Sequence, residues 1–287
     1  MCHLLNSCEQ LQHLELNKCD TGDLSTLEIN MPNSKISHLR LTYCRFEKVE
    51  FLCLPKLAVL YCEYWISSNA PISFGHVPCL EELGLVCAAS RYHSGLSLSE
   101  LLHGSIEIKA LTLDFHGETI WMLTEGRKLC TSFNKLTKMF IHGIHVKFGL
   151  LWTITLLETA PSLKTFGIEV CNHVCDVDSE ETRRAFPKRP NPWRSSKKFS
   201  GSRHLQLRRL EFVSFMAIKK HVQFIRCVMD YAPNLDTIVL QDKDPCGSCD
   251  AVNSNVTSMF PKNKNEQDML LNQLRNGASH SIEILFK

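Results

Sequence analysis

The stretch APSLKTFGIE, residues 160–169, contains the pattern that decides the fold. Its apolar positions are Leu163, Phe166 and Ile168, spaced as L-x-x-L-x-L. The same spacing returns along the chain, beginning at Leu11, Ile36, Leu57, Leu80, Ile108, Leu136, Leu207 and Leu235. Most of these starting positions lie 21 to 28 residues apart. A phrase that recurs at a regular period indicates an array of similar structural units.

Each phrase predicts a short β-strand whose side chains alternate between two faces. In the first phrase Leu14 and Leu16 face inward, and Leu11 turns inward from the approach to the strand. Such strands stack as a parallel sheet, because each unit covers the apolar face that its neighbour leaves open. A period of about 20–29 residues with this spacing is typical of leucine-rich repeats (LRRs). The sequence therefore predicts an α/β fold: a curved LRR solenoid with helices and irregular segments on its convex side.

The repeats predict the organisation of the whole chain. Residues 1–287 are expected to form a single LRR domain of about nine repeats, closed by a strand at 282–286. Three returning segments have apolar residues at helical spacing and predict helices at Gly149–Thr159, Ala217–Ala232 and Asn265–Asn276. The buried stripe predicted for the second helix comprises Ile218, Val222, Ile225, Val228 and Met229.

The interval between Leu163 and Leu207 is longer than the others. Its excess, residues 176–203, begins acidic, becomes basic and contains three prolines, which predicts an inserted mobile surface loop. The less favoured alternative is a nuclear-localisation or nucleic-acid-binding role for its basic residues, which are Arg183, Arg184, Lys188, Arg189, Lys197 and Lys198.

Composition limits the classes of protein that the chain can belong to. It is 44% hydrophobic and 22% charged, as in an ordinary globular protein, and its formal net charge of +2 argues against duplex DNA or an anionic membrane as partner. Residues 1–20 lack the regions of a secretory signal peptide, and the apolar run at 148–157 is too short to span a bilayer. We therefore expect a cytoplasmic or nuclear protein whose fourteen cysteines are reduced and mostly buried.

Motifs for chemistry are weak. Cys246 and Cys249 form a C-x-x-C pair, which could hold zinc, but the further ligands at 171–175 lie about three repeats away, or roughly 15 Å. The pair therefore stays only a weak metal candidate. His142 and His145 have no carboxylate nearby in the sequence to orient either ring. With no catalytic or nucleotide-binding motif present, the sequence predicts a protein that is not an enzyme and has no cofactor.

The C-terminal half resembles a known family. The segments that carry the resemblance are FNKLTKMFIHGIHVKFGLLWTITLLETAPSLKTFGIEV (133–170), LQLRRLEFVSF (205–215), HVQFIRCVMDYAPNLDTIVLQDKDPCGSC (221–249) and FPKNKNEQDMLLNQLRNGASHSIEILF (260–286). Together they resemble the C-terminal LRR domain of plant F-box/LRR proteins of the meiotic F-box or FBD-like type. In that family an N-terminal F-box binds the Skp adaptor of a cullin ubiquitin ligase, and the repeats recognise the substrate.

The chain departs from the family before its first repeat. Ten residues precede Leu11, and they contain no F-box. We therefore expect a fragment of a longer protein, a gene that has lost its F-box, or first strands that something else covers. The resemblance implies Skp and cullin as partners only if an F-box lies upstream. The alternative is a free-standing LRR scaffold or binding protein with no ligase role.

A partner protein is expected to bind the outward-pointing strand residues, which line the concave face of the predicted solenoid. They are His13, Glu15, Asn17, His38, Arg40, Thr42, Val59, Tyr61, Glu63, Glu82, Thr112, Asp114, Lys138, Phe140, His142, Thr165, Glu169, Arg209, Glu211 and Gln241. Tyr61 and Phe140 are the predicted anchors, because exposed aromatic side chains concentrate interface energy. Replacing both by alanine is expected to weaken partner binding and to leave the melting temperature unchanged.

Overall fold

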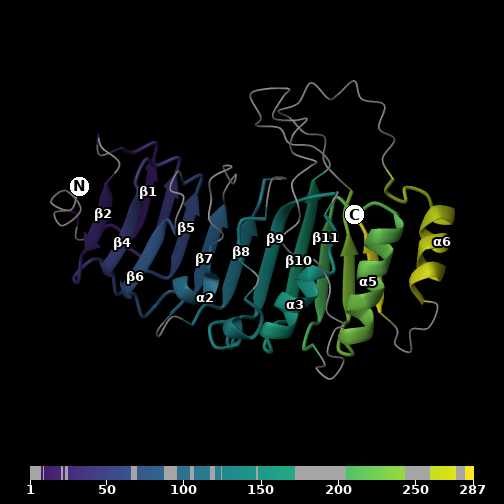
Figure 1. Cartoon of the computed structure of the whole chain (residues 1–287). Helices are drawn as coiled ribbons and strands as arrows, with labels where there is room; N and C mark the ends of the chain where they lie inside the picture. The colour runs from purple at the N-terminus through teal and green to yellow at the C-terminus, as the bar shows by residue number, and fades with distance from the viewer. Residues whose placement is uncertain are drawn as a thin grey trace.

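The computed structural model describes residues 8, 10–20, 22, 25–65, 70–86, 96–103, 107–116, 120–123, 125–146, 148–171, 205–242, 259–275 and 282–287. The strands that the repeats predict are β1 (His13–Asn17), β3 (His38–Thr42), β5 (Val59–Glu63), β7 (Glu82–Val86), β8 (Ala110–Asp114), β9 (Lys138–His145), β10 (Thr165–Cys171), β11 (Arg209–Val213), β12 (Thr237–Leu240) and β13 (Glu283–Phe286). All ten belong to one sheet and follow one another along the molecule (Figure 1). The predicted α/β solenoid fold is confirmed.

Register keeps the repeated leucines beside one another. The strands of the large sheet are parallel, and Leu14 pairs with Leu39, which pairs with Leu60. The pairing continues through Leu83 to Leu111. From Leu39 onward these side chains are at most 2% exposed, because each is covered by its neighbours in the adjoining strands.

A second sheet, which the sequence reading did not predict, covers the first repeats. It contains β2 (Thr26–Asn30), β4 (Lys48–Cys53) and β6 (Ile72–His76), all parallel, in that order. Its inward side chains, which include Leu27, Ile29, Val49 and Phe51, belong to the same hydrophobic core as the large sheet. The first returning segments are therefore strands, because their apolar residues alternate with a period of two.

Helices replace this second sheet in the later repeats. They are α2 (Leu98–Leu101), the 3₁₀ helix η1 (Gly126–Cys130), α3 (Trp152–Thr159), α5 (Lys219–Tyr231) and α6 (Lys264–Arg275). Figure 1 shows α2, α3 and α5 along one side of the strands. The three predicted helices are α3, α5 and α6, and they are confirmed with shifted ends.

The predicted stripe of α5 is partly wrong. Its buried residues are His221, Phe224, Ile225 and Val228, while Val222 and Met229 are only half-buried. The helix is rotated toward Phe224, because this ring is larger than the aliphatic side chains and lies 6.0 Å from the ring of Phe212 in β11.

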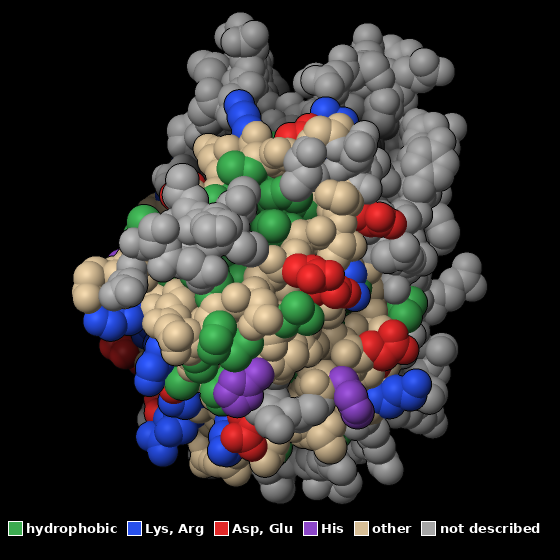
Figure 2. Space-filling model, turned by 90° about the vertical axis from the view of Figure 1, so that its left-hand side faces the viewer, with side chains coloured by type: hydrophobic (Ala, Val, Ile, Leu, Met, Phe, Trp, Pro, Cys, Tyr) green, Lys and Arg blue, Asp and Glu red, His purple; other side chains and the backbone are tan. Residues whose placement is uncertain are grey.

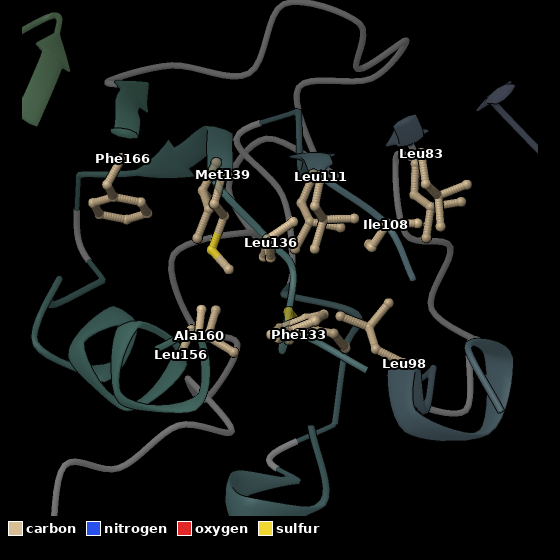
Figure 3. Packing of buried hydrophobic residues seen from close by; sticks show 14 of the residues in the cluster. Leu83, Leu98, Ile108, Leu111, Phe133, Leu136, Met139, Leu156, Ala160 and Phe166 are labelled. Carbon is tan, nitrogen blue, oxygen red and sulfur yellow. The ribbon is translucent and has the colours of Figure 1, made fainter. Parts of the chain in front are cut away.

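The core between the strands and helices is continuous. In Figure 3, Leu111, Met139 and Phe166 point from successive strands toward Leu156 and Ala160 of the α3 region. All five are at most 2% exposed. Burying a side chain of this size contributes about 1.5–3 kcal/mol, so the stability of each repeat depends on the next one.

The N-terminal end of the array is less covered than its middle. The edge strands there are β1 and β2, and hydrophobic side chains are visible on this end in Figure 2. Leu16 and Leu27 retain 9% and 8% exposure, and Leu11 and Leu14 are only partly buried.

The cysteine prediction is wrong about burial. The described cysteines are all free thiols, but only Cys44 and Cys62 are buried, whereas Cys8 and Cys79 are exposed and the others intermediate. Burial raises the pKa of the Cys62 thiol to about 12, so this thiol is unreactive. "Mostly buried" is therefore wrong for the described cysteines.

Several sequence predictions lie outside the described residues: the mobile loop at 176–203 and the pair Cys246 and Cys249. Within the described ranges, no group of three or more His, Cys, Asp or Glu side chains is placed to hold a metal ion. In the same ranges, no helix has both the length and the apolar character needed to cross a membrane.

One buried histidine makes stability depend on pH. His221 is 2% exposed, its ring lies 4.8 Å from that of Phe212, and its Nδ1 accepts a hydrogen bond from the backbone N–H of Met216 at 3.2 Å. Burial, with a smaller effect of Lys220, lowers the pKa of His221 to about 4. Between this pKa and the ordinary value of 6.5, His221 therefore stays neutral in the folded state and takes up a proton in the unfolded chain.

Between pH 6.5 and 4, this histidine is expected to lower the free energy of unfolding by about 3 kcal/mol, because only the unfolded state takes up the proton. Above pH 6.5 its effect is absent. Denaturant unfolding of wild type and His221→Gln across this range measures it. The variant should lose this part of the pH dependence, and equal slopes for the two proteins would contradict the assignment.

Candidate partner-binding face

The outward positions of the large sheet form the face on which a partner is expected. Each strand contributes alternate residues beginning with its first, and we call the surface that they form the open face. The predicted residues all occupy such positions, except Gln241, which directly follows β12, and none of them is buried. Described helices and the second sheet pack on the opposite side. The binding role of these residues stays a prediction.

The two predicted anchors are half-buried, because each ring covers a glycine of the next strand. Tyr61 is in register with Gly84, and Phe140 is in register with Gly167. A Cβ atom built on either glycine would lie 2.2 Å from a ring carbon, the Cδ1 of Tyr61 or of Phe140. Both rings thus lie along the sheet and do not project freely from it. The expectation that their removal leaves the melting temperature unchanged is therefore replaced by an expected loss of stability.

Charged neighbours hold Tyr61 in place. Its hydroxyl donates a hydrogen bond to Glu82 Oε1 at 2.6 Å, and the guanidinium carbon of Arg40 lies 5.2 Å from its ring centroid. Arg40 also pairs with Glu63 at 3.5 Å. Burial first, and then the neighbouring Glu82 carboxylate, raise the pKa of Tyr61. These contacts join β3, β5 and β7, so this part of the open face is preorganised.

His142 has the carboxylate partner that sequence reading did not find. Its Nδ1 and Glu169 Oε2 are 2.9 Å apart, on the neighbouring strands β9 and β10. Burial lowers the pKa of His142, but the hydrogen bond and charge of Glu169 together with the charge of Asp114 outweigh it, and the net shift is upward. The expectation of no orienting carboxylate is therefore wrong, because the partner lies 27 residues away in the sequence.

Asp114 is fixed by the turn that follows β8. Its Oδ1 accepts a hydrogen bond from the backbone N–H of His116 at 2.8 Å. Gly143 packs against this turn with a φ of +65°, and a Cβ on it would lie 2.4 Å from the same Oδ1. Only glycine fits here, since both the backbone conformation and the close approach exclude a side chain.

Basic side chains gather where β9, β10 and β11 begin. Lys138 and Arg209 are the first residues of their strands, and Lys164 and Arg208 directly precede β10 and β11. Arg209 Nε donates to Glu211 Oε1 at 2.6 Å within its own strand. Lys164 and Arg208 were not predicted, because they lie one position outside the alternating pattern.

A comparison with known families identifies the family to which these repeats belong. Residues 1–275 match the family described as the LRR domain of At1g61320/AtMIF1. The chain belongs to this plant LRR family. The match confirms the LRR part of the resemblance but does not confirm the F-box or FBD-like type. A search of curated proteins found no match, and neither did a search of solved structures.

Stacked aromatic side chains form a further feature of this LRR domain that the sequence did not reveal. Tyr43 and Tyr64, two residues beyond Leu41 and Cys62 in adjacent repeats, have ring centroids 4.1 Å apart and an interplanar angle of 5°. Both have positive φ, near +53° and +55°. The left-handed conformation that ends each strand places these rings one above the other. Tyrosines at equivalent positions of consecutive repeats were the available signal.

The glycine beneath Phe140 can be tested by a double-mutant cycle. Gly167→Ala is expected to lower the free energy of unfolding by about 1–3 kcal/mol, because the new Cβ displaces the ring. In a Phe140→Ala background the same substitution should be nearly neutral. Denaturant unfolding measures both values. An equal loss in both backgrounds would show that the ring does not rest on this glycine.

The His142–Glu169 pair can be tested by titration. Glu169→Gln is expected to lower the pKa of His142 in an NMR titration, because it removes the acceptor charge. Since the folded pKa is raised, the pair stabilises the fold below the unfolded value near 6.5 and loses this effect as pH rises through the folded pKa. Asp114→Asn, whose charge has the smaller effect, is the comparison. An unchanged pKa in Glu169→Gln would contradict the pairing.

Proposed function

We propose that this LRR domain is a protein-interaction module that recognises a partner through its open face. The observation that carries the proposal is two separate cross-strand groups, Arg40 with Tyr61 and Glu82 on β3, β5 and β7, and His142 with Glu169 on β9 and β10. These side chains are held in defined positions on a surface that remains accessible. Ordering the binding groups in advance reduces the entropy lost on association. The proposed role is binding and includes no catalytic step.

More specifically, we propose that the chain is the substrate-recognition part of an SCF-type ubiquitin ligase receptor. Membership of a plant LRR family and the resemblance of residues 133–286 to F-box/LRR proteins support it. Skp and cullin would then join through an F-box encoded upstream, and the protein would act in the cytoplasm or nucleus. The other candidate is a free-standing LRR binding protein of the same compartments.

Blocking the open face is expected to abolish partner capture. Thr112→Arg adds a long side chain beside Phe140, and Thr165→Arg adds one beside Lys138; both are half-exposed outward positions from which the new side chains extend into solvent. Thr26→Arg with Asn30→Arg is the matched control on exposed positions of the second sheet. The readout is quantitative mass spectrometry of the proteins retained from a plant extract.

A partner should be retained by wild type and by the control, and reduced about tenfold or more by the blocked variant, since central interface positions dominate binding. Equal retention by all three proteins would contradict binding through the open face. Thermal melting of each variant controls for folding.

The ligase role depends on the messenger RNA. If its 5′ end extends into a frame encoding an F-box, the full-length product is expected to co-purify with a Skp adaptor, and removal of the F-box should abolish this. If transcription starts close to Met1, the free-standing binding protein is the correct function.

A further inference from the structure

The beginning of β9, β10 and β11 carries positive charge that the described structure does not neutralise. Among the described residues, Lys138, Lys164 and Arg208 form no ion pair, and all three are exposed. The neighbouring lysine on β8's approach, Lys109, differs, because it is paired with Glu81 at 2.5 Å. Adjacent strands lie about 4.8 Å apart, so the three cations, with Lys164 and Arg208 one residue before the row of Lys138, span roughly 10 Å across the beginning of the strands.

The opposite end of the neighbouring strands β8 and β10 is acidic. Asp114 and Glu169 occupy the last outward positions of β8 and the corresponding position of β10, on either side of His142. Asp114 approaches His116 Nε2 at 3.8 Å, and Glu169 is bonded to His142. Both carboxylates remain partly exposed, at 26% and 31% of the side chain, so a cation from outside can reach them.

An apolar surface separates the two charged ends. Phe140 lies at the middle outward position of β9, over Gly167, with Thr112 of β8 in register on its other side. Its ring is half-buried, which leaves part of it open to a ligand. Along β9 the sequence of outward groups is therefore cation, aromatic ring and imidazole flanked by carboxylates.

Positive charge therefore lies where β9–β11 begin, and carboxylates lie near the ends of β8 and β10. From Lys138 to His142 the distance is four residues, or about 13 Å at 3.3 Å per residue. An extended peptide has the same rise and presents every second side chain to one surface. Three alternate side chains of a peptide aligned with the strands therefore meet the cations, the ring and the carboxylates in turn.

We propose that β8–β11 bind an extended segment of the partner protein in which an acidic, an apolar and a basic residue alternate as acidic-x-apolar-x-basic, in either chain direction. The acidic residue meets Lys138, Lys164 and Arg208, the apolar residue covers Phe140, and the basic residue meets Asp114 and Glu169. This inference rests on the proposed function and specifies its ligand. A nucleic acid fits less well, because its uniform negative charge would meet the two carboxylates.

Selection from a phage-displayed library of random peptides, with the full chain immobilised, tests the proposal. The face variant is Lys138→Glu with Lys164→Glu. The matched control is Lys219→Glu with Lys220→Glu, at exposed positions of α5 on the opposite side. Circular dichroism melting of both variants controls for folding. An enriched peptide is then synthesised and its affinity for each protein measured.

Wild type and control are expected to enrich acidic-x-apolar-x-basic peptides. The synthesised peptide should bind the face variant about tenfold more weakly, because two attractive charges become repulsive. The face variant should select peptides in which Lys or Arg replaces the acidic residue. No enrichment, enrichment of another pattern, or an unchanged affinity for the face variant would overturn the proposal.

Two further outcomes separate this inference from the proposed function. If another pattern is enriched and Thr112→Arg with Thr165→Arg blocks it, the open face binds partners but the assigned ligand is wrong. If neither set of open-face substitutions affects the enriched peptides, both proposals fail. Binding of a fluorescein-labelled single-stranded oligonucleotide that the two lysine substitutions abolish would also overturn the assigned ligand class.

Discussion

Everything in this molecule depends on the in-register contact between the inward leucines of successive strands. Leu39, Leu60 and Leu83 are buried only because the adjoining strands pair leucine with leucine, and a shift of one residue would turn this row toward solvent. The same register fixes the other side of the sheet, because side chains alternate. A row of aligned core residues therefore implies a row of aligned surface residues. The open face is a consequence of how the core packs, and its groups are held at the spacing of the strands.

The sequence predicted those parts of the fold that repeat and missed those that do not. All ten strands of the large sheet could be predicted, nine from a local L-x-x-L-x-L spacing and the last, β13, as the strand that closes the array. The strands β2, β4 and β6 were not predicted. In segments such as Thr26–Asn30 apolar and polar residues alternate over only five residues, and these segments share no repeated phrase. The rotation of α5 was also missed, since periodicity alone does not say that Phe224 outweighs Val222 in filling the core.

The positions of the site residues could be predicted from the sequence, but the contacts between them were harder to predict. Each outward residue could be assigned from alternation, but the pair His142 and Glu169 joins two repeats, and so do the rings of Tyr61 and Phe140 with their glycines. Aligning the repeats on their leucines would have placed Gly84 beside Tyr61 and Gly167 beside Phe140. An aromatic residue followed by glycine at the same position of the next repeat is therefore a usable signal for a ring that lies along the sheet. Partner identity has no comparable signal, because it depends on a second molecule.

Photo-cross-linking tests most directly whether the open face is the surface that partners contact. p-Benzoylphenylalanine is introduced in place of Thr165, an outward residue at the beginning of β10 on the open face, or in place of Thr26 on the second sheet, and the protein is irradiated in a plant extract. Binding through the open face predicts a cross-linked partner from position 165 and none from position 26. A partner cross-linked from position 26 and not from position 165 would place recognition on the opposite side of the solenoid and contradict the role assigned to the sheet.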